Sequence, residues 1–389
     1  MDQKMKIGIA GAGAMGTGIA QVAAMAGHQV VVFDPFEKSL KRSATNLDND
    51  FKKLVDKGKL ESSSANTIRE RITHVSDIQA LSQCGLVIEA AVELLEVKKK
   101  LFTDLESIVD VHCILATNTS SLSVISIAAS CQHRGRVIGI HFFNPAAIMP
   151  LVEIIPAFTT EDSVFHSAKS IVDSWGKVTV KAKDTPGFIV NRIARPFYGE
   201  AIKMYEEGIA SFADIDHAMR TIGGFRMGPF ELMDLIGNDI NFSVTETVWK
   251  QMFYDPRYRP SITQQRLFEA GLFGRKSGRG YFDYSEGAIS PQPTSDERKL
   301  KYIFNRILCM LINEAADALY MGIANRDDIE TAMTKGVNYP KGLLMWADEI
   351  GIKQVCDTIN NLYNDYHDDR YRPSLLLKKM AAENGRFFN

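Results

Sequence analysis

The sequence KIGIAGAGAMG, residues 6–16, sets an apolar run directly before glycines spaced as Gly-x-Gly-x-x-Gly. These glycines are Gly11, Gly13 and Gly16, and an amphipathic pattern follows them. Such spacing serves a tight turn, close approach of a pyrophosphate to the backbone, and close packing of a helix on a strand. The pyrophosphate would then meet free N–H groups where the helix begins. The stretch predicts a dinucleotide-binding turn that includes Met15.

An acidic residue at the end of the second expected strand points to the cofactor. Asp34 follows Gly11 by 23 residues, where a carboxylate would bond the adenosine ribose hydroxyls. The same carboxylate would repel the 2′-phosphate of NADP, and residues 35–37 supply no arginine to bind that phosphate. The sequence therefore favours NAD.

Short apolar runs alternate with longer amphipathic ones through the first half of the chain, which is typical of βαβ units and a parallel sheet. The pattern stops at Thr185-Pro186-Gly187, and the remainder is typical of helices. We expect an α/β, Rossmann-like doubly wound domain over residues 1–184. Its expected strands are Lys6–Ala10, Gln29–Phe33, Leu86–Glu89, Ile114–Thr117, Val137–His141, Val152–Ile155 and Val178–Lys181.

The helical half contains an internal repeat. Many matches at one offset indicate a duplicated domain. We expect two all-α copies, residues 185–284 and 298–389, joined by a linker rich in proline, glycine and serine. The matches at an offset of 114 are Asn191-Arg192 with Asn305-Arg306, Glu200-Ala201 with Glu314-Ala315, and Ala218-Met219 with Ala332-Met333; RYRPS at 257–261 recurs 113 positions later at 370–374.

Composition excludes several classes of protein. The 389 residues are 45% hydrophobic and 24% charged, as in globular proteins, and the net charge of −2 gives no basis for binding nucleic acid or an anionic membrane. The densest basic run, Lys98–Lys100, is expected to be a solvated helix face. Five scattered cysteines indicate reduced thiols, with no disulfide framework and no metal. With no leader and no membrane-spanning run, we expect a cytoplasmic protein.

A histidine and a glutamate are the candidate catalytic pair. His141 ends a predicted strand, and the carboxyl ends of strands are where open α/β sheets meet their ligands. Oxidation of a secondary alcohol needs a base near neutral pH, for which histidine is suited. Glu153 lies within the next apolar strand and needs a partner there, which the imidazole would provide.

Four motifs make the chain similar to the 3-hydroxyacyl-CoA dehydrogenase family over residues 5–284, and the tail resembles members with a doubled helical domain. The resemblance implies NAD-dependent oxidation of an L-3-hydroxyacyl-CoA, bound between the dinucleotide and helical domains. The motifs are GAGAMGTGIAQ at 11–21, NTSSL at 118–122, HFFNP at 141–145 and KDTPGFIVNR at 183–192.

The resemblance also implies roles for individual residues. His141 would be the base and Glu153 its partner, while Ser120 and Asn191 would hydrogen-bond the substrate oxygens. Asn118 is either a further polar neighbour or a turn residue. The NAD contacts implied by the family are Glu93, Lys98, Ser120, Asn144 and Lys276.

The CoA side and the second copy are less defined. Lys57 corresponds to a family lysine near a CoA phosphate, although a lysine in such a helix is equally often solvated surface, and Asp50 replaces a CoA-contacting serine of some relatives. Single-copy relatives dimerise through their helical domains. We therefore expect either a homodimer or a monomer whose two copies form an internal pseudo-dimer.

Two other functions fit the same fold. One is an NAD-dependent dehydrogenase of a sugar acid such as gulonate, which would require a cation near Ser120. The other is a nucleotide-binding scaffold without activity, which would have no use for the His141–Glu153 pair.

Overall fold

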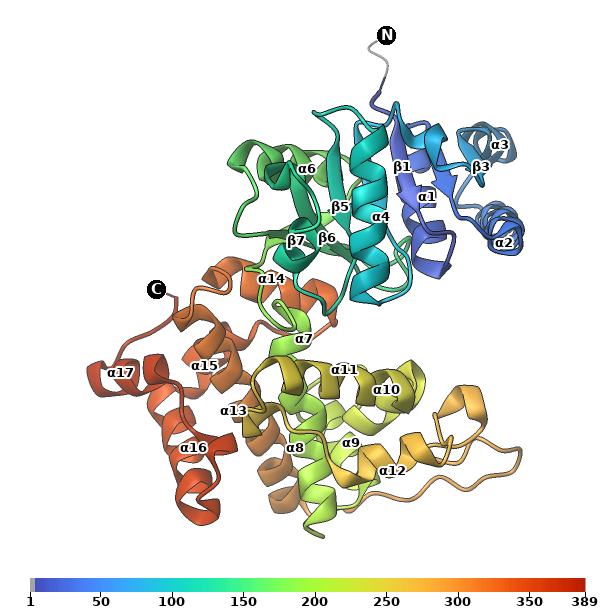
Figure 1. The fold of residues 1–389 in the computed structure, drawn as a ribbon. Helices are drawn as coiled ribbons and strands as arrows, with labels where there is room; N and C mark the ends of the chain where they lie inside the picture. Colours follow the sequence, from blue (N-terminus) through green and yellow to red (C-terminus); the bar gives the residue numbers. More distant parts are fainter. Residues whose placement is uncertain (1–3, 389) are drawn as a thin grey trace. The chain divides into compact units, whose positions relative to one another are not determined.

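The computed structural model describes residues 4–388 and divides the chain into two compact units, Met1–Thr185 and Pro186–Asn389. Figure 1 shows a sheet with flanking helices in the first unit and helices throughout the second. No helix among the described residues is long and apolar enough to cross a bilayer. The five cysteines are buried free thiols.

The first unit is built on one eight-stranded sheet of order β3-β2-β1-β4-β5-β6-β7-β8. The order runs outward in both directions from β1 and β4, as in a doubly wound fold. The strands are β1 Ile7–Ala10, β2 Val30–Phe33, β3 Ile72–Val75, β4 Leu86–Glu89, β5 Ile114–Thr117, β6 Val137–Phe142, β7 Leu151–Pro156 and β8 Val178–Lys181.

Two findings differ from the expected sheet. Strand β3 was not predicted, because ITHV at 72–75 is short and only its first residue is buried. Strand β7 runs antiparallel to β6, whereas the expectation was a parallel sheet. Only residues 143–150 join these two strands, and a parallel crossover requires about a dozen residues or more.

Helices cover both faces of the sheet and bury one apolar layer on each. One core joins the sheet to α1, α2, α3 and α6, and the other joins it to α4 and α5. The sheet is therefore buried between two helical layers, which leaves its strand ends as the places where polar groups gather. These helices are α1 Ala14–Met25, α2 Glu37–Asp56, α3 Ser62–Glu70, α4 Leu95–Ile108, α5 Val124–Ala128 and α6 Asp162–Ser174.

The second unit contains the two copies, and their helices follow one another in the same order. The first copy has α7 Val190–Ile193, α8 Arg195–Glu206, α9 Phe212–Thr221, α10 Pro229–Ile236, α11 Asn238–Gln251 and α12 Ile262–Glu269. The second has α13 Glu297–Tyr320, α14 Arg326–Gly336, α15 Leu343–Ile350, α16 Ile352–Tyr366 and α17 Leu375–Glu383. Helix α13 alone takes the place of α7 and α8.

Buried ion pairs connect the copies reciprocally. Glu314 of the second copy accepts from Arg192 at 2.7 Å and from Arg257 at 3.1 Å, both of the first copy. Glu200 of the first copy accepts from Arg306 of the second at 2.6 Å. Because Arg306 is the repeat of Arg192 and Glu314 the repeat of Glu200, each copy gives the other the same contact, as in a twofold-symmetric dimer.

Candidate active site

The glycine-rich turn has the geometry that a dinucleotide requires. Gly11 has φ of +122°, and a Cβ there would lie 2.5 Å from the carbonyl oxygen of Ala90. A Cβ on Gly16 would lie 1.9 Å from the oxygen of Gly11, so only glycine lets α1 approach β1. A Cβ on Gly13 would meet nothing within 4 Å, which leaves the backbone open to a pyrophosphate.

Asp34 lies beside this turn. Its Oδ2 accepts from the backbone N–H of Ala12 at 2.9 Å, and its Oδ1 accepts from that of Phe36 at 3.0 Å. These bonds hold a carboxylate at the end of β2, where ribose hydroxyls would be met. Met15, on the first turn of α1, is half-buried and packs against the core. The turn and its acid fit NAD.

A buried network follows the ends of β4 and β5. Lys98 is 1% exposed and donates to Glu89 at 2.6 Å, and it lies 3.1 Å from Glu93. Thr117 donates to the other oxygen of Glu89 at 2.7 Å. The prediction that Lys98–Lys100 form a solvated helix face is therefore wrong for Lys98. Lys99 and Lys100 are partly and largely exposed.

Glu93 connects this network to the loop that carries Ser120. Its Oε1 accepts from the backbone N–H of Ser120 at 3.0 Å and from the hydroxyl of Thr119. Burial opposes ionisation of Glu93, but Lys98 and these hydrogen bonds outweigh it, so the pKa of Glu93 lies below its ordinary value. The negative charge is thus held in place at the strand ends.

Asn118 and Asp184 hold the two ends of the same loop. The side-chain oxygen of Asn118 accepts from the backbone N–H of Phe142 at 2.8 Å, which joins β5 to β6. The carboxylate of Asp184 accepts from the backbone N–H groups of Val124 and Ile125 at 3.0 and 2.8 Å. Burial raises the pKa of Asp184, although these bonds oppose the rise.

His141 and Glu153 face each other across neighbouring strands. They are direct partners in the antiparallel register of β6 and β7, and Nδ1 of His141 lies 2.7 Å from Oε2 of Glu153. The histidine is 5% exposed and the glutamate fully buried. An ionised carboxylate only accepts, so the proton lies on Nδ1 and Nε2 becomes the basic nitrogen. The ring of Phe143 lies 4.5 Å from the imidazole, centre to centre.

The remaining candidates are more exposed. Asn144 lies on the surface just beyond β6, and Lys57 is exposed at the end of α2. Lys276, in the helical unit, pairs with Asp239 at 2.6 Å. Asn191 lies on α7 of the same unit. The structure thus gathers the candidates of the first unit near its strand ends, apart from Lys57 at the end of α2, and places Asn191 and Lys276 in the second unit.

Sequence reasoning missed Glu89, Thr117, Thr119 and Asp184. Glu89 did carry a signal, because a carboxylate that closes the fully buried strand LVIE needs a partner. The two threonines precede Ser120 and could have been suspected only from position. Asp184 stood inside a quoted motif, but its bonds to residues 60 positions earlier depend on tertiary structure.

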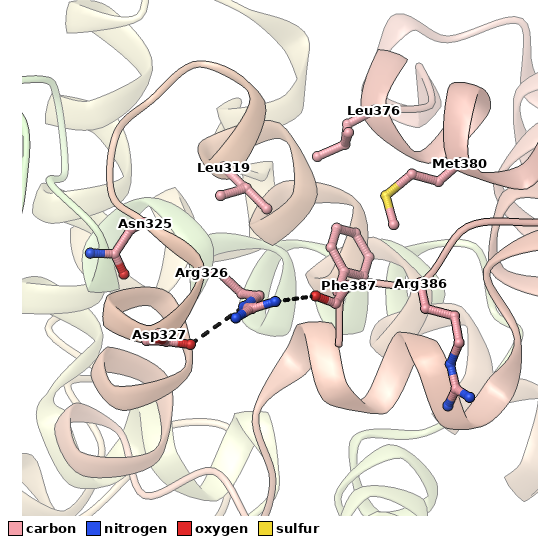
Figure 2. A pocket seen from close by; sticks show the side chains of 8 residues that line it. All are labelled: Leu319, Asn325, Arg326, Asp327, Leu376, Met380, Arg386 and Phe387. Atoms are coloured by element: carbon pink, nitrogen blue, oxygen red, sulfur yellow. Dashed lines mark hydrogen bonds and ion pairs between the residues drawn. The ribbon is translucent and has the colours of Figure 1, made fainter. Parts of the chain in front are cut away.

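A pocket of about 390 Å³ lies elsewhere, in the second helical copy. Figure 2 shows Arg326 beside the apolar side chains of Leu319, Met380 and Phe387. None of the candidate site residues lines it. Among the described residues, no cluster of three or more histidine, cysteine, aspartate or glutamate side chains is arranged to hold a metal.

The doubly wound sheet, the glycine turn with its acid, and the buried His141–Glu153 pair together define an NAD-dependent dehydrogenase. Comparison with known proteins supports and narrows this class. The family model described as "3-hydroxyacyl-CoA dehydrogenase, NAD binding domain" matches residues 6–185, and the C-terminal domain of that family matches residues 187–284 and 302–387. The chain belongs to the 3-hydroxyacyl-CoA dehydrogenase family.

Individual relatives agree with this assignment. A 3-hydroxyadipyl-CoA dehydrogenase of Escherichia coli is 36% identical, with 96% of this chain and 97% of that protein covered. The mitochondrial hydroxyacyl-coenzyme A dehydrogenase of Homo sapiens is 40% identical over 71% of this chain and 90% of its own length. The crystal structure of a 3-hydroxybutyryl-CoA dehydrogenase from E. coli superposes with a TM-score of 0.92 at 35% identity, covering 98% of both chains.

Proposed function

We propose that the protein oxidises an L-3-hydroxyacyl-CoA to the 3-oxoacyl-CoA, reversibly, with NAD. The observation that carries the proposal is the buried pair of His141 and Glu153, 2.7 Å apart at the ends of strands in a dinucleotide-binding unit. Family membership supports it over the sugar-acid and scaffold alternatives. The reaction belongs to fatty-acid β-oxidation or related acyl-CoA metabolism.

The chemistry follows from the tautomer that Glu153 imposes. Bound NAD supplies the hydride acceptor. His141 takes the hydroxyl proton of the substrate at Nε2, and Glu153 stabilises the imidazolium that results. Ser120 and Asn191 position the oxygen as it becomes a carbonyl. The burial of both residues of the pair limits the access of water to it.

Binding roles complete the proposal. The turn residues Gly11, Gly13, Met15 and Gly16 hold the pyrophosphate, Asp34 holds the ribose, and Glu93, Lys98, Asn144 and Lys276 contribute to the nicotinamide half. Lys57, exposed and cationic, would meet a phosphate of CoA. The buried free thiols suit a reducing compartment, and we place the enzyme in the cytoplasm.

The second helical copy would replace a partner subunit. The reciprocal contacts of Glu200 and Glu314 reproduce within one chain what a twofold dimer forms between two. The catalytic unit is then a monomer of three parts: residues 1–184, the copy at 185–284 and the copy at 298–389.

The test compares thioester and free acid as substrates. NADH oxidation should proceed with acetoacetyl-CoA or a longer 3-oxoacyl-CoA, and not with acetoacetate or a free sugar acid. His141→Ala should lose about 10²–10⁴ in kcat because the base is gone, while NADH titration shows unchanged affinity. His112→Ala, at an exposed position of the same unit, is the matched control and should keep full turnover.

Wild-type turnover by His141→Ala would contradict the assigned base. Turnover of the free acids alone would contradict the substrate class. The names of the relatives specify different acyl groups, 3-hydroxyadipyl and 3-hydroxybutyryl. The acyl group that this enzyme accepts therefore depends on its own residues.

A further inference from the structure

Arg195 is a buried guanidinium without an acidic partner. It is 7% exposed, donates from Nε to the carbonyl oxygen of Asn191 at 2.9 Å and from Nη1 to the hydroxyl of Thr245 at 3.0 Å. Its Cζ lies 5.0 Å from the centre of the Tyr198 ring. Among the described residues, no carboxylate forms an ion pair with it. Burial lowers the pKa of Arg195, but a guanidinium remains charged near neutral pH.

The other large buried arginines of this unit are all paired. Arg192, Arg257, Arg306 and Arg370 each form an ion pair with a buried glutamate. An uncompensated buried charge typically costs several kcal/mol. The contacts of Arg195 with the described residues therefore do not offset the cost of burying its charge. Its Nη2 donates to no described residue.

A chain of buried polar side chains continues from Arg195. Thr245 donates to the carbonyl oxygen of Asn241 at 2.7 Å, and the amide of Gln264 donates to the side-chain oxygen of Asn241 at 2.8 Å. All three residues are less than a tenth exposed. These hydrogen bonds fix the hydroxyl of Thr245 and hence one side of the Arg195 guanidinium. The three residues carry no negative charge.

The second helical copy shows that the fold does not need this row of buried polar side chains. The equivalent residues there are all apolar or nearly so, and all are buried. The same helices thus pack with a continuous apolar core when they do not carry a substrate contact. The polar chain belongs only to the copy that holds Asn191. The pairs are Arg195 with Cys309, Thr245 with Ile359, Asn241 with Val355, and Gln264 with Leu377.

We propose that Arg195 binds a carboxylate at the far end of the acyl group, which makes the enzyme selective for carboxylated 3-hydroxyacyl-CoA substrates. The inference rests on the proposed function. Arg195 begins α8 four residues after Asn191 of α7, and Ala194 between the two helices keeps a helical backbone, so the two residues are separated by about one helical turn, roughly 6 Å. That spacing suits a six-carbon chain, in which the carboxylate lies three carbons beyond the hydroxyl carbon. A guanidinium binds a carboxylate with paired hydrogen bonds, which discriminates against a methyl group.

The test uses two thioesters of equal length, 3-oxoadipyl-CoA and 3-oxohexanoyl-CoA, which differ only in the terminal carboxylate. The wild-type enzyme should show a kcat/KM at least about 10²-fold higher for the carboxylated thioester, since an unmatched buried charge is costly. Arg195→Cys installs the residue of the second copy and should lower this ratio about 10²-fold or more. The ratio is independent of the fraction of active enzyme.

Two further variants complete the experiment. Arg195→Lys keeps the charge without the planar fork, so its ratio should fall between those of the wild type and Arg195→Cys. If the cysteine variant fails to fold, this variant still decides the matter. Arg266→Leu removes an exposed arginine of α12 and should keep the wild-type ratio.

Three results would overturn the proposal. Equal kcat/KM for the two thioesters in the wild type is one. A ratio unchanged in both Arg195 variants is another, as expected for an arginine that only holds the helix or contacts the thioester. Absence of turnover with either thioester is the third, and it rejects the proposed function as well only if acetoacetyl-CoA is not turned over either; the first two results leave that function standing.

Discussion

The two helical copies share a scaffold but differ in a group of buried residues that is polar in the first copy and apolar in the second. In each, an acidic side chain caps a helix: Asp216 accepts from the first N–H groups of α10, and Glu330 from those of α15. Each copy also turns at a glycine with positive φ, Gly237 at 108° and Gly351 at 95°. These features recur because the fold requires them.

The differences between the two copies also follow a pattern. The first copy buries the polar chain that starts at Arg195, and the second replaces it with an apolar core. If only the first copy contacts substrate, as we propose, buried polar groups that cost stability have no role in the second copy. On this proposal, the features that the copies share serve stability, and the buried polar residues kept only by the first copy serve function.

The shared scaffold should give the largest effect when broken. Glu314→Gln leaves Arg192 and Arg257 buried against an uncharged amide, and we expect a loss of about 3–5 kcal/mol in the free energy of unfolding. Denaturant titration followed by circular dichroism measures it. Asp357→Asn, which breaks an exposed pair with Lys353, should cost less than about 0.5 kcal/mol.

Acid provides an independent measure of the same contact. Burial would raise the pKa of Glu314, but Arg192 and Arg257 outweigh it and hold the pKa below its ordinary value. A depressed folded-state pKa contributes stability above the unfolded value, about 4.3, that is lost as pH falls through the folded value. The wild type should lose this part of its stability in acid, and Glu314→Gln should lack it.

A tight dimer in sedimentation velocity, formed through the helical unit, would contradict the internal pseudo-dimer.

The next comparison is between equivalent asparagines. If Asn191 donates to the developing carbonyl oxygen, as we propose, Asn191→Ala should lower kcat/KM by about 10²–10³. Asn305→Ala changes the same residue type in the second copy and should leave both kinetic constants unaltered. Steady-state kinetics with one 3-oxoacyl-CoA decides this. Equal losses in the two variants would mean that Asn191 acts on folding rather than on substrate.

Much of this architecture was readable from the sequence because its signals are local. The glycine turn needs three residues without Cβ, and the repeat preserves Arg192, Glu200 and their equivalents at a fixed offset. The pairing of His141 with Glu153 followed from the cost of a carboxylate in an apolar strand, and the structure brings the two within hydrogen-bonding distance.

Other features could not be read because they depend on partners distant in the sequence. Lys98 appeared to belong to a surface run, and only the fold brings Glu89 beneath it. The reversal of β7 depends on how residues 143–150 turn. Arg195 has an ordinary place in an amphipathic helix, and its lack of an acidic partner becomes visible only when the surrounding helices are in position.

The smallest effect concerns one position at the start of equivalent helices. In the first copy, the ring of Phe212 packs on Phe282 at 4.9 Å and on Tyr205 at 5.9 Å, centre to centre. In the second, Arg326 takes its place, and its guanidinium lies 4.3 Å from the centre of the Phe388 ring. Arg326 also donates to the carbonyl oxygen of Phe387 at 2.6 Å (Figure 2). Arg326 also lines the pocket of about 390 Å³.

Exchanging these residues should therefore have unequal costs. Phe212→Arg breaks up an aromatic cluster and should cost about 1–3 kcal/mol in the free energy of unfolding. Arg326→Phe exchanges one hydrogen bond and a cation–π contact for apolar contact within an open pocket, so its effect should stay within about 1 kcal/mol. Denaturation midpoints of the two variants measure the difference. Equal costs would mean that the second copy is as finely packed at this position as the first, and that the pocket is no sign of relaxed constraint.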